Sequence, residues 1–154
     1  MALVVPSSWC PCLLLPGCNL VPPTLKSVAS KWGSAVKADT QGRPLLFYCE
    51  LRVVRADDLW LSQNTTDAGG DTLALAFGMN KADPARVMAA ARDMEAALNG
   101  AGLKPKPHWA KLHAMAPAHV ASLYGDAVPR FRELRERVDP ACKFSNAWTR
   151  SYGL

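Results

Sequence analysis

This sequence lacks most of the patterns that assign a function directly. Its five cysteines show no spacing typical of a zinc site, and Cys10-Pro11-Cys12 is too short for a redox pair. No Walker-type phosphate loop is present, and Gly69-Gly70 has no dinucleotide-binding context. The longest apolar stretch is too short to span a bilayer. We therefore predict no metal site, no nucleotide-binding loop and no transmembrane segment.

Positive charge is present but not concentrated. The 154 residues carry a net charge of +5, with an isoelectric point near 9.1. A nucleic-acid site needs denser basic residues interleaved with aromatics, so no nucleic-acid partner is expected. The only loose cluster lies on one predicted helix and is typical of a solvated face: Arg130, Arg132, Arg135 and Arg137.

The first eighteen residues are apolar but are interrupted by Pro6, Pro11 and Pro16. No basic residue precedes this apolar run, so it does not resemble a secretory signal. We expect residues 1–18 to be a poorly structured N-terminal segment and residues 19–154 to form the domain. Cys49 lies in an apolar run and is interpreted as a small core residue, and the thiols are expected to be reduced.

The periodicity of the remaining chain predicts four helices and two strands. Alternating β-forming residues predict the strands, and apolar residues at helical spacing with proline or glycine at the ends predict the helices. The strands are residues 45–54 and 72–79, and the helices begin at Pro22 and Asp83-Pro84 and cover residues 117–124 and 125–138.

This order of elements predicts an α+β fold, with a small antiparallel sheet and helices packed on one face. Two strands alone make a poor sheet. Either another part of a longer protein donates the missing strands, or the isolated chain is marginally stable. We interpret the chain as an incomplete fragment of a larger protein.

The first strand carries the first candidate site. Its alternation places an apolar set, from Leu45 to Val53, on one face and Tyr48, Glu50 and Arg52 on the other. An acid and a guanidinium side by side can address a ligand together. They can equally form a solvated ion pair, which is the more common arrangement for such neighbours.

The second candidate is residues 107–113 (PHWAKLH), which follow the turn-forming residues 104–107. Prolines fix the backbone there, and a fixed backbone fixes where His108 and Lys111 point. The same residues also suit an ordinary loop with a half-buried Trp109.

Three segments together resemble one family. They are residues 49–62 (CELRVVRADDLWLS), 107–111 (PHWAK) and 139–146 (DPACKFSN), in the same order and spacing as in the C-terminal part of FAD-dependent sugar-1,4-lactone and alditol oxidases. These enzymes belong to the vanillyl-alcohol oxidase superfamily. Each motif is weak alone, but the ordered set covers about residues 19–150.

The resemblance implies roles for four residues. Glu50 and Arg52 match positions that line the substrate pocket, Lys111 matches a pocket lysine, and His108 matches a histidine near FAD and the substrate. Lys111 and His108 would be the catalytic residues, Lys111 would also contact substrate, and His108 would be the cofactor-binding residue. The reaction would pass a hydride from a sugar lactone or polyol to flavin, with oxygen as the expected acceptor.

Two departures from the family pattern affect this interpretation. The family has a hydroxyl side chain about where Gly78 falls, so either substrate preference differs or the register is shifted by one residue. The FAD-binding domain is also absent, so FAD would be bound mainly by a domain in the same gene or a separate chain. A non-catalytic sugar-binding module or an inactive fragment is the alternative, and localisation stays open between cytoplasm and peripheral membrane association.

Overall fold

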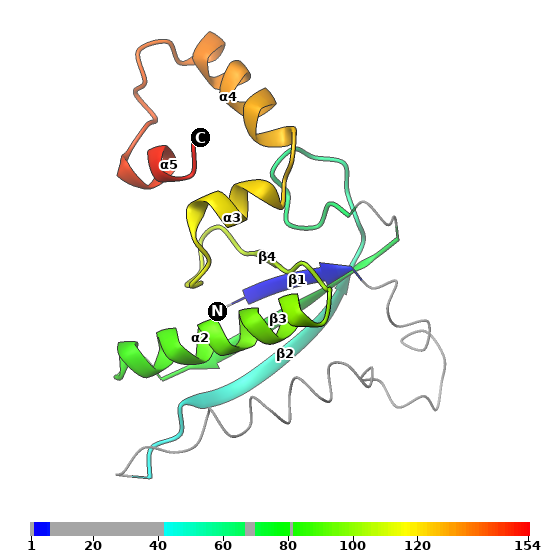
Figure 1. Ribbon diagram of the computed structural model, residues 1–154, viewed down its shortest axis with the longest axis vertical. Helices are drawn as coiled ribbons and strands as arrows, with labels where there is room; N and C mark the ends of the chain where they lie inside the picture. The colour runs from blue at the N-terminus through cyan, green and yellow to red at the C-terminus, as the bar shows by residue number, and fades with distance from the viewer. Residues whose placement is uncertain (1, 7–41, 67–69, 81) are drawn as a thin grey trace.

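A computed structural model describes residues 2–6, 42–66, 70–80 and 82–154. In this part of the chain, four antiparallel strands form one sheet in the order β2-β3-β1-β4 (Figure 1). The strands are β1 (Ala2–Pro6), β2 (Leu46–Val54), β3 (Thr72–Met79) and β4 (Lys106–Pro107).

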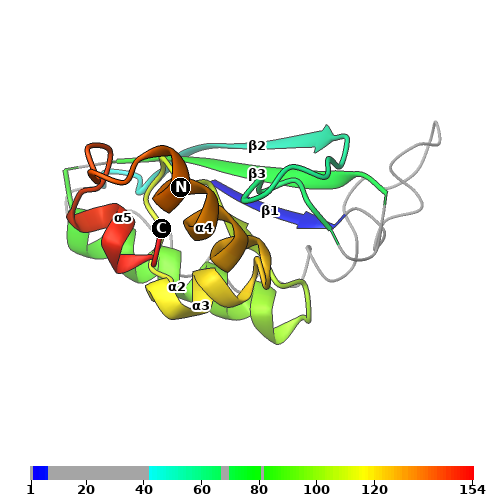
Figure 2. The ribbon, with the colours of Figure 1, turned by 90° about the horizontal axis from the view of Figure 1, so that it is seen from above.

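The described helices lie to one side of this sheet. Figure 2 shows α2 and α3 below the strands, and Figure 1 shows α3, α4 and α5 beyond the β4 edge. The helices are α2 (Pro84–Gly100), α3 (Pro117–Ser122), α4 (Ala127–Val138) and α5 (Ala147–Ser151). The α+β prediction is confirmed, whereas the helix predicted from Pro22 lies outside the described residues.

The N-terminal strand corrects two expectations. Residues 1–18 were expected to be poorly structured, but Ala2–Pro6 forms β1 between β3 and β4, while residues 7–18 lie outside the described residues. Leu3 is fully buried and Val4 nearly so, which gives this short apolar segment a reason to pair. The chain therefore supplies the strands that the sequence had left missing.

The core lies between the sheet and α2. Alternation on β3 points Leu73, Leu75 and Phe77 to one face, where they join the buried residues of α2 in a single cluster. The predicted apolar stripe of α2 is confirmed, since its four members are all buried: Val87, Ala91, Met94 and Leu98.

β2 is less buried than its sequence suggests. Leu51 and Val53 are each 46% exposed, although they pair with the buried Leu75 and Leu73, and Phe47 at the register irregularity is 62% exposed. β2 is an edge strand, and the buried core cluster takes three residues from β3 and none from β2. The interpretation of Cys49 as a core residue is wrong: its thiol is exposed, with partial burial raising its pKa.

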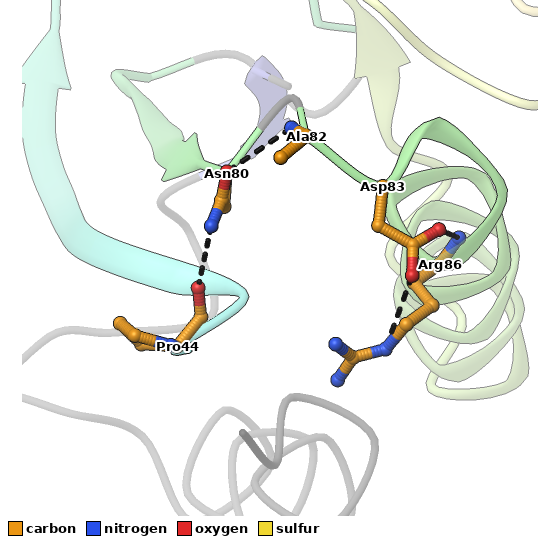
Figure 3. Close-up of polar contacts among 5 residues, drawn as sticks. All are labelled: Pro44, Asn80, Ala82, Asp83 and Arg86. Carbon is orange, nitrogen blue, oxygen red and sulfur yellow. Dashed lines mark hydrogen bonds and ion pairs between the residues drawn. The ribbon is translucent and has the colours of Figure 1, made fainter. Parts of the chain in front are cut away.

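The start of α2 is fixed by two polar side chains (Figure 3). Asp83 Oδ1 accepts a hydrogen bond of 3.1 Å from the Arg86 N–H, as predicted for a capping acid before a proline. Asn80 Nδ2 donates to the Pro44 carbonyl at 3.3 Å, and its Oδ1 accepts from the Ala82 N–H at 3.0 Å. Asn80 thus ties the segment before β2 to the turn that leads into α2.

The C-terminal helices were predicted in part. α3 and α4 fall within their expected ranges, and Val128 is buried on α4 as expected. Val138, expected on the same apolar stripe, is 68% exposed because it occupies the last turn of α4. α5 was not predicted, since five residues are too few to show a helical period.

Candidate functional site

Glu50 and Arg52 form a two-pronged pair on β2. Arg52 Nε donates to Glu50 Oε1 at 2.6 Å, and Arg52 Nη2 donates to Glu50 Oε2 at 2.7 Å. Both side chains are solvent-exposed, the guanidinium more than the carboxylate. The hydrogen bond lowers the pKa of Glu50 and raises the pKa of Arg52. The carboxylate therefore stays ionised, and it is better suited to accept hydrogen bonds than to take up a proton.

The strand beside this pair offers a floor of small residues. Glu50 pairs with Ala76, Arg52 with Ala74 and Tyr48 with Gly78, and paired residues share a face of the sheet. This is the face opposite the α2 core. Gly78, noted in the sequence for its lack of a hydroxyl, is covered by the Tyr48 ring.

His108 and Lys111 lie on one tight turn after β4. The Lys111 N–H donates to the His108 carbonyl at 2.9 Å, and the Ala110 N–H donates to His108 Nδ1 at 3.1 Å. Because Nδ1 accepts this bond, the neutral imidazole carries its proton on Nε2. The turn thus presents two donors, His108 Nε2–H and the exposed Lys111 ammonium.

The two halves of the candidate site lie at opposite edges of the sheet. Pro107 pairs with Leu3, Leu3 with Leu75 and Leu75 with Leu51, so His108 continues β4 at the level of Glu50. Three strand spacings, about 14 Å, separate β2 from β4 across the sheet. In the described ranges no hydrogen bond or ion pair joins the Glu50–Arg52 pair to His108 or Lys111. The structure brings together the members of each half, and places the halves at one height.

Trp109, between His108 and Lys111, is a packing residue. Its Nε1 donates to the Leu61 carbonyl at 2.7 Å. Its ring stacks on Tyr124 with centroids 5.0 Å apart, and it meets Trp148 and Tyr152 edge-on at 5.8 and 5.7 Å. The half-buried tryptophan expected from the sequence is therefore the centre of an aromatic cluster.

The loop after β2 is held by hydrogen bonds within itself and by Lys106 of β4. Asp57 shapes it by accepting from the Leu59 N–H at 3.1 Å and from Ser62 Oγ at 2.7 Å. A second link comes from Lys106 Nζ, which donates to the Thr65 carbonyl at 2.8 Å. The loop therefore runs from the end of β2 to the β4 edge.

The third family segment leads into α5. The buried Asp139 carboxylate accepts from the Lys143 N–H at 2.9 Å and from the Phe144 N–H at 3.0 Å, which closes a turn after α4. Asn146 then caps α5 reciprocally with Thr149. Trp148 of α5, which follows this segment, meets the Trp109 ring, and the first family segment reaches Trp109 through the Leu61 carbonyl.

Three residues in or beside this cluster, His113, Tyr152 and Glu95, were assigned no role from the sequence. His113 Nε2 lies 3.1 Å from Tyr152 Oη, and the buried Glu95 accepts from the Ala114 N–H at 2.8 Å through Oε1. Desolvation lowers the pKa of His113 and raises the pKa of Glu95. The available signal was that Glu95 lies four residues after Ala91, on the apolar stripe of α2.

The described residues form neither a cluster of metal ligands nor a membrane-spanning helix. No group of three or more His, Cys, Asp or Glu side chains there is placed to hold a metal ion. Within the same ranges, no helix combines the length and apolar character needed to cross a bilayer.

Comparison with known proteins supplies the family. The family model for D-arabinono-1,4-lactone oxidase matches residues 24–152. An alditol oxidase of Streptomyces sp. is 36% identical over 107 residues, covering 70% of this chain and 24% of that protein. A protein of Neurospora crassa, provisionally named D-arabinono-1,4-lactone oxidase, is 45% identical over 49 residues, or 32% of this chain and 9% of its own length. This chain therefore spans less than a quarter of either relative, and it belongs to the D-arabinono-1,4-lactone oxidase family.

Proposed function

We propose that this chain forms the substrate-binding part of an oxidase that acts on a sugar-1,4-lactone or an alditol. The observation that carries the proposal is the Glu50–Arg52 pair, exposed on a strand face beside Ala74 and Ala76. The names of the two relatives support the substrate class, since one is an alditol oxidase and the other is named for a lactone. Oxygen is the proposed electron acceptor.

Glu50 and Arg52 bind hydroxyl groups in this proposal. The lowered pKa of Glu50 keeps its carboxylate ionised, so its lone pairs accept hydrogen bonds from adjacent hydroxyls. Arg52 holds that carboxylate from one side and offers its remaining N–H groups as donors. A fixed carboxylate and a fixed guanidinium together orient a polyhydroxyl chain.

His108 and Lys111 stabilise negative charge on the reacting oxygen. Both present donors from a single turn, with Nε2–H on one and the ammonium on the other. Donors held in place before the reaction are more effective than water, which must reorient. In this role His108 donates a hydrogen bond, because its Nδ1 is already engaged by the Ala110 N–H.

The described residues His108 and Lys111 fit one part of FAD, the group that the family implies. The His108 and Lys111 donors suit the edge of a flavin ring, whereas we assign no described residues to its diphosphate and adenine. When bound, flavin supplies the hydride acceptor for the oxidation of the carbinol carbon. In this proposal a flavin-binding domain, encoded in the same gene or as a separate chain, binds the rest of FAD.

Co-expression tests the proposal. The chain would be produced together with the remainder of the Streptomyces alditol oxidase, and oxygen uptake measured with xylitol and with D-arabinono-1,4-lactone. We expect uptake with at least one substrate, and its loss in the Lys111→Ala variant. Lys143→Ala is the matched control, because it removes an exposed lysine from a turn outside the site.

The outcomes separate the alternatives. Uptake that survives both Lys111→Ala and Glu50→Ala would refute the site assignment. A colourless complex that binds xylitol without oxygen uptake would favour a non-catalytic sugar-binding module. A complex that neither binds sugar nor takes up oxygen would identify an inactive fragment.

A further inference from the structure

Tyr48 contacts Gly78 on the sheet face opposite the α2 core, and the proposed function gives this contact no role. The two residues are directly paired across β2 and β3, next to the register irregularity between Leu46 and Tyr48. A methyl group built on Gly78 would overlap the Tyr48 ring, with Cδ1 and Cζ only 2.5 Å away. Tyr48 therefore lies directly on a glycine, and no other residue type leaves room for the ring there.

This arrangement gives Tyr48 a defined direction. An edge-strand tyrosine that is 60% exposed would ordinarily sample several rotamers. Here the ring leans across the sheet instead, onto the strand that carries Ala76 and Ala74. Tyr48 and Glu50 lie two residues apart on one strand face, about 7 Å along the strand. Tyr48 thus shares one face of β2 with the proposed hydroxyl-binding pair.

The pair is held from one direction along the strand. Glu50 is bonded through both carboxylate oxygens to Arg52, which follows it on β2, whereas Tyr48 precedes it. Tyr48, Glu50 and Arg52 therefore form one row that pairs with the small residues of β3.

We propose that Tyr48 is a specificity-determining residue that contacts the substrate and binds a hydroxyl of a polyhydroxyl chain held by Glu50. The apolar face of its ring covers the C–H groups of that chain, and its hydroxyl both donates and accepts. A substrate with a hydroxyl at the end that Tyr48 contacts is bound in preference to a substrate without that hydroxyl. This role rests on the proposed function, because it needs the Glu50–Arg52 pair to bind sugar.

Nuclear magnetic resonance of the full chain tests the contact and the role separately. The ring of Tyr48 should shift the Gly78 amide signal, and Tyr48→Ala should remove that shift while Tyr48→Phe retains it. Gly78→Ala should destabilise the chain, because the new methyl overlaps the ring. In the Tyr48→Ala/Gly78→Ala double variant that destabilisation should disappear. A stabilising Gly78→Ala, the usual result within a strand, would overturn the contact.

Titration with xylitol, alongside D-arabinono-1,4-lactone, then tests the role. We expect Tyr48→Phe to weaken xylitol binding by about 3- to 10-fold, the loss of one hydrogen bond. Tyr124→Phe is the control, since it removes a buried phenol hydroxyl outside the site and should leave binding unchanged. Equal binding by Tyr48→Phe and the unaltered chain would overturn the role of Tyr48 alone. Failure of the unaltered chain to bind either sugar would overturn the proposed function and this role with it.

Discussion

The two edges of the sheet are built in opposite ways, although both carry motifs of the same family. At the β2 edge, Glu50 and Arg52 are exposed and hold each other. At the β4 edge, Trp109 is held by the Leu61 carbonyl of another family segment and by Trp148 of α5. The β4 edge therefore combines a packing residue, Trp109, with the exposed Lys111, whereas both motif residues of the β2 edge are exposed. Substitution of Trp109 should affect stability, and substitution of the β2 pair should affect sugar binding.

Removing Trp109 should have the largest effect on stability. Trp109→Ala deletes a ring that contacts three other aromatic side chains and breaks the bond to Leu61. We expect the free energy of unfolding to fall by about 4 kcal/mol, measured by urea denaturation. Trp60→Ala is the matched control, because Trp60 is 43% exposed and the Arg130 guanidinium lies over its ring. Equal losses in the two variants would show that Trp109 is not a packing centre.

Asp139 should rank second, because its buried carboxylate accepts from two backbone N–H groups. Asp139→Ala leaves the Lys143 and Phe144 N–H groups without their buried acceptor, at a cost of about 3 kcal/mol. Asp139→Asn keeps one acceptor oxygen and should lose less. Asp126→Ala is the control, because Asp126 precedes α4 without a side-chain capping bond. Thermal unfolding of the three variants gives the order, and an unaffected Asp139→Ala would contradict it.

The buried Glu95 should give a smaller effect that depends on pH. Desolvation raises its pKa above 4.5 in the folded chain, so the folded state binds the proton more tightly than the unfolded state. Its stabilising contribution is therefore complete below pH 4.5 and is lost as pH rises through the folded pKa.

Glu95→Gln keeps an acceptor for the Ala114 N–H and removes the titration. At pH 7 we expect its free energy of unfolding, measured by urea denaturation, to exceed that of the unaltered chain by on the order of 1 kcal/mol. The difference should vanish below pH 4.5, and a difference that is constant with pH would show that Glu95 is not desolvated. Glu133→Gln, on the exposed face of α4, is the control.

The sequence predicted the features that depend on local patterns and missed those that depend on distant partners. Strong local patterns predicted β3 to the residue and the start of α2, because alternation and an Asp-Pro cap are local signals. β1 was missed because its burial depends on partners far along the chain, β3 and β4. The exposure of Leu51 was missed for a related reason, since alternation gives a strand's faces but not its place in the sheet.

The candidate site was predictable only as residue types. The resemblance identified Glu50, Arg52, His108 and Lys111, and the direct pairing of the first two followed from their spacing. No sequence pattern showed that β1 would separate β3 from β4 and so set the width between the halves. The seating of Tyr48 on Gly78 was equally hidden, because it requires the register of β2 on β3.

The smallest effect on stability should come from the Glu50–Arg52 pair. Both groups are exposed, so Glu50→Gln should leave the urea midpoint unchanged while it weakens xylitol binding. Binding should also report the pKa of Glu50. In the unaltered chain the hydrogen bond from Arg52 lowers that pKa, so on acidification binding should fall only as the pH approaches this lowered value. In Arg52→Gln the carboxylate loses this partner and protonates at higher pH, so binding should begin to fall earlier on acidification. Identical pH profiles for the two proteins would mean that the Glu50 carboxylate does not bind the sugar, and this would remove the β2 edge from the proposed site.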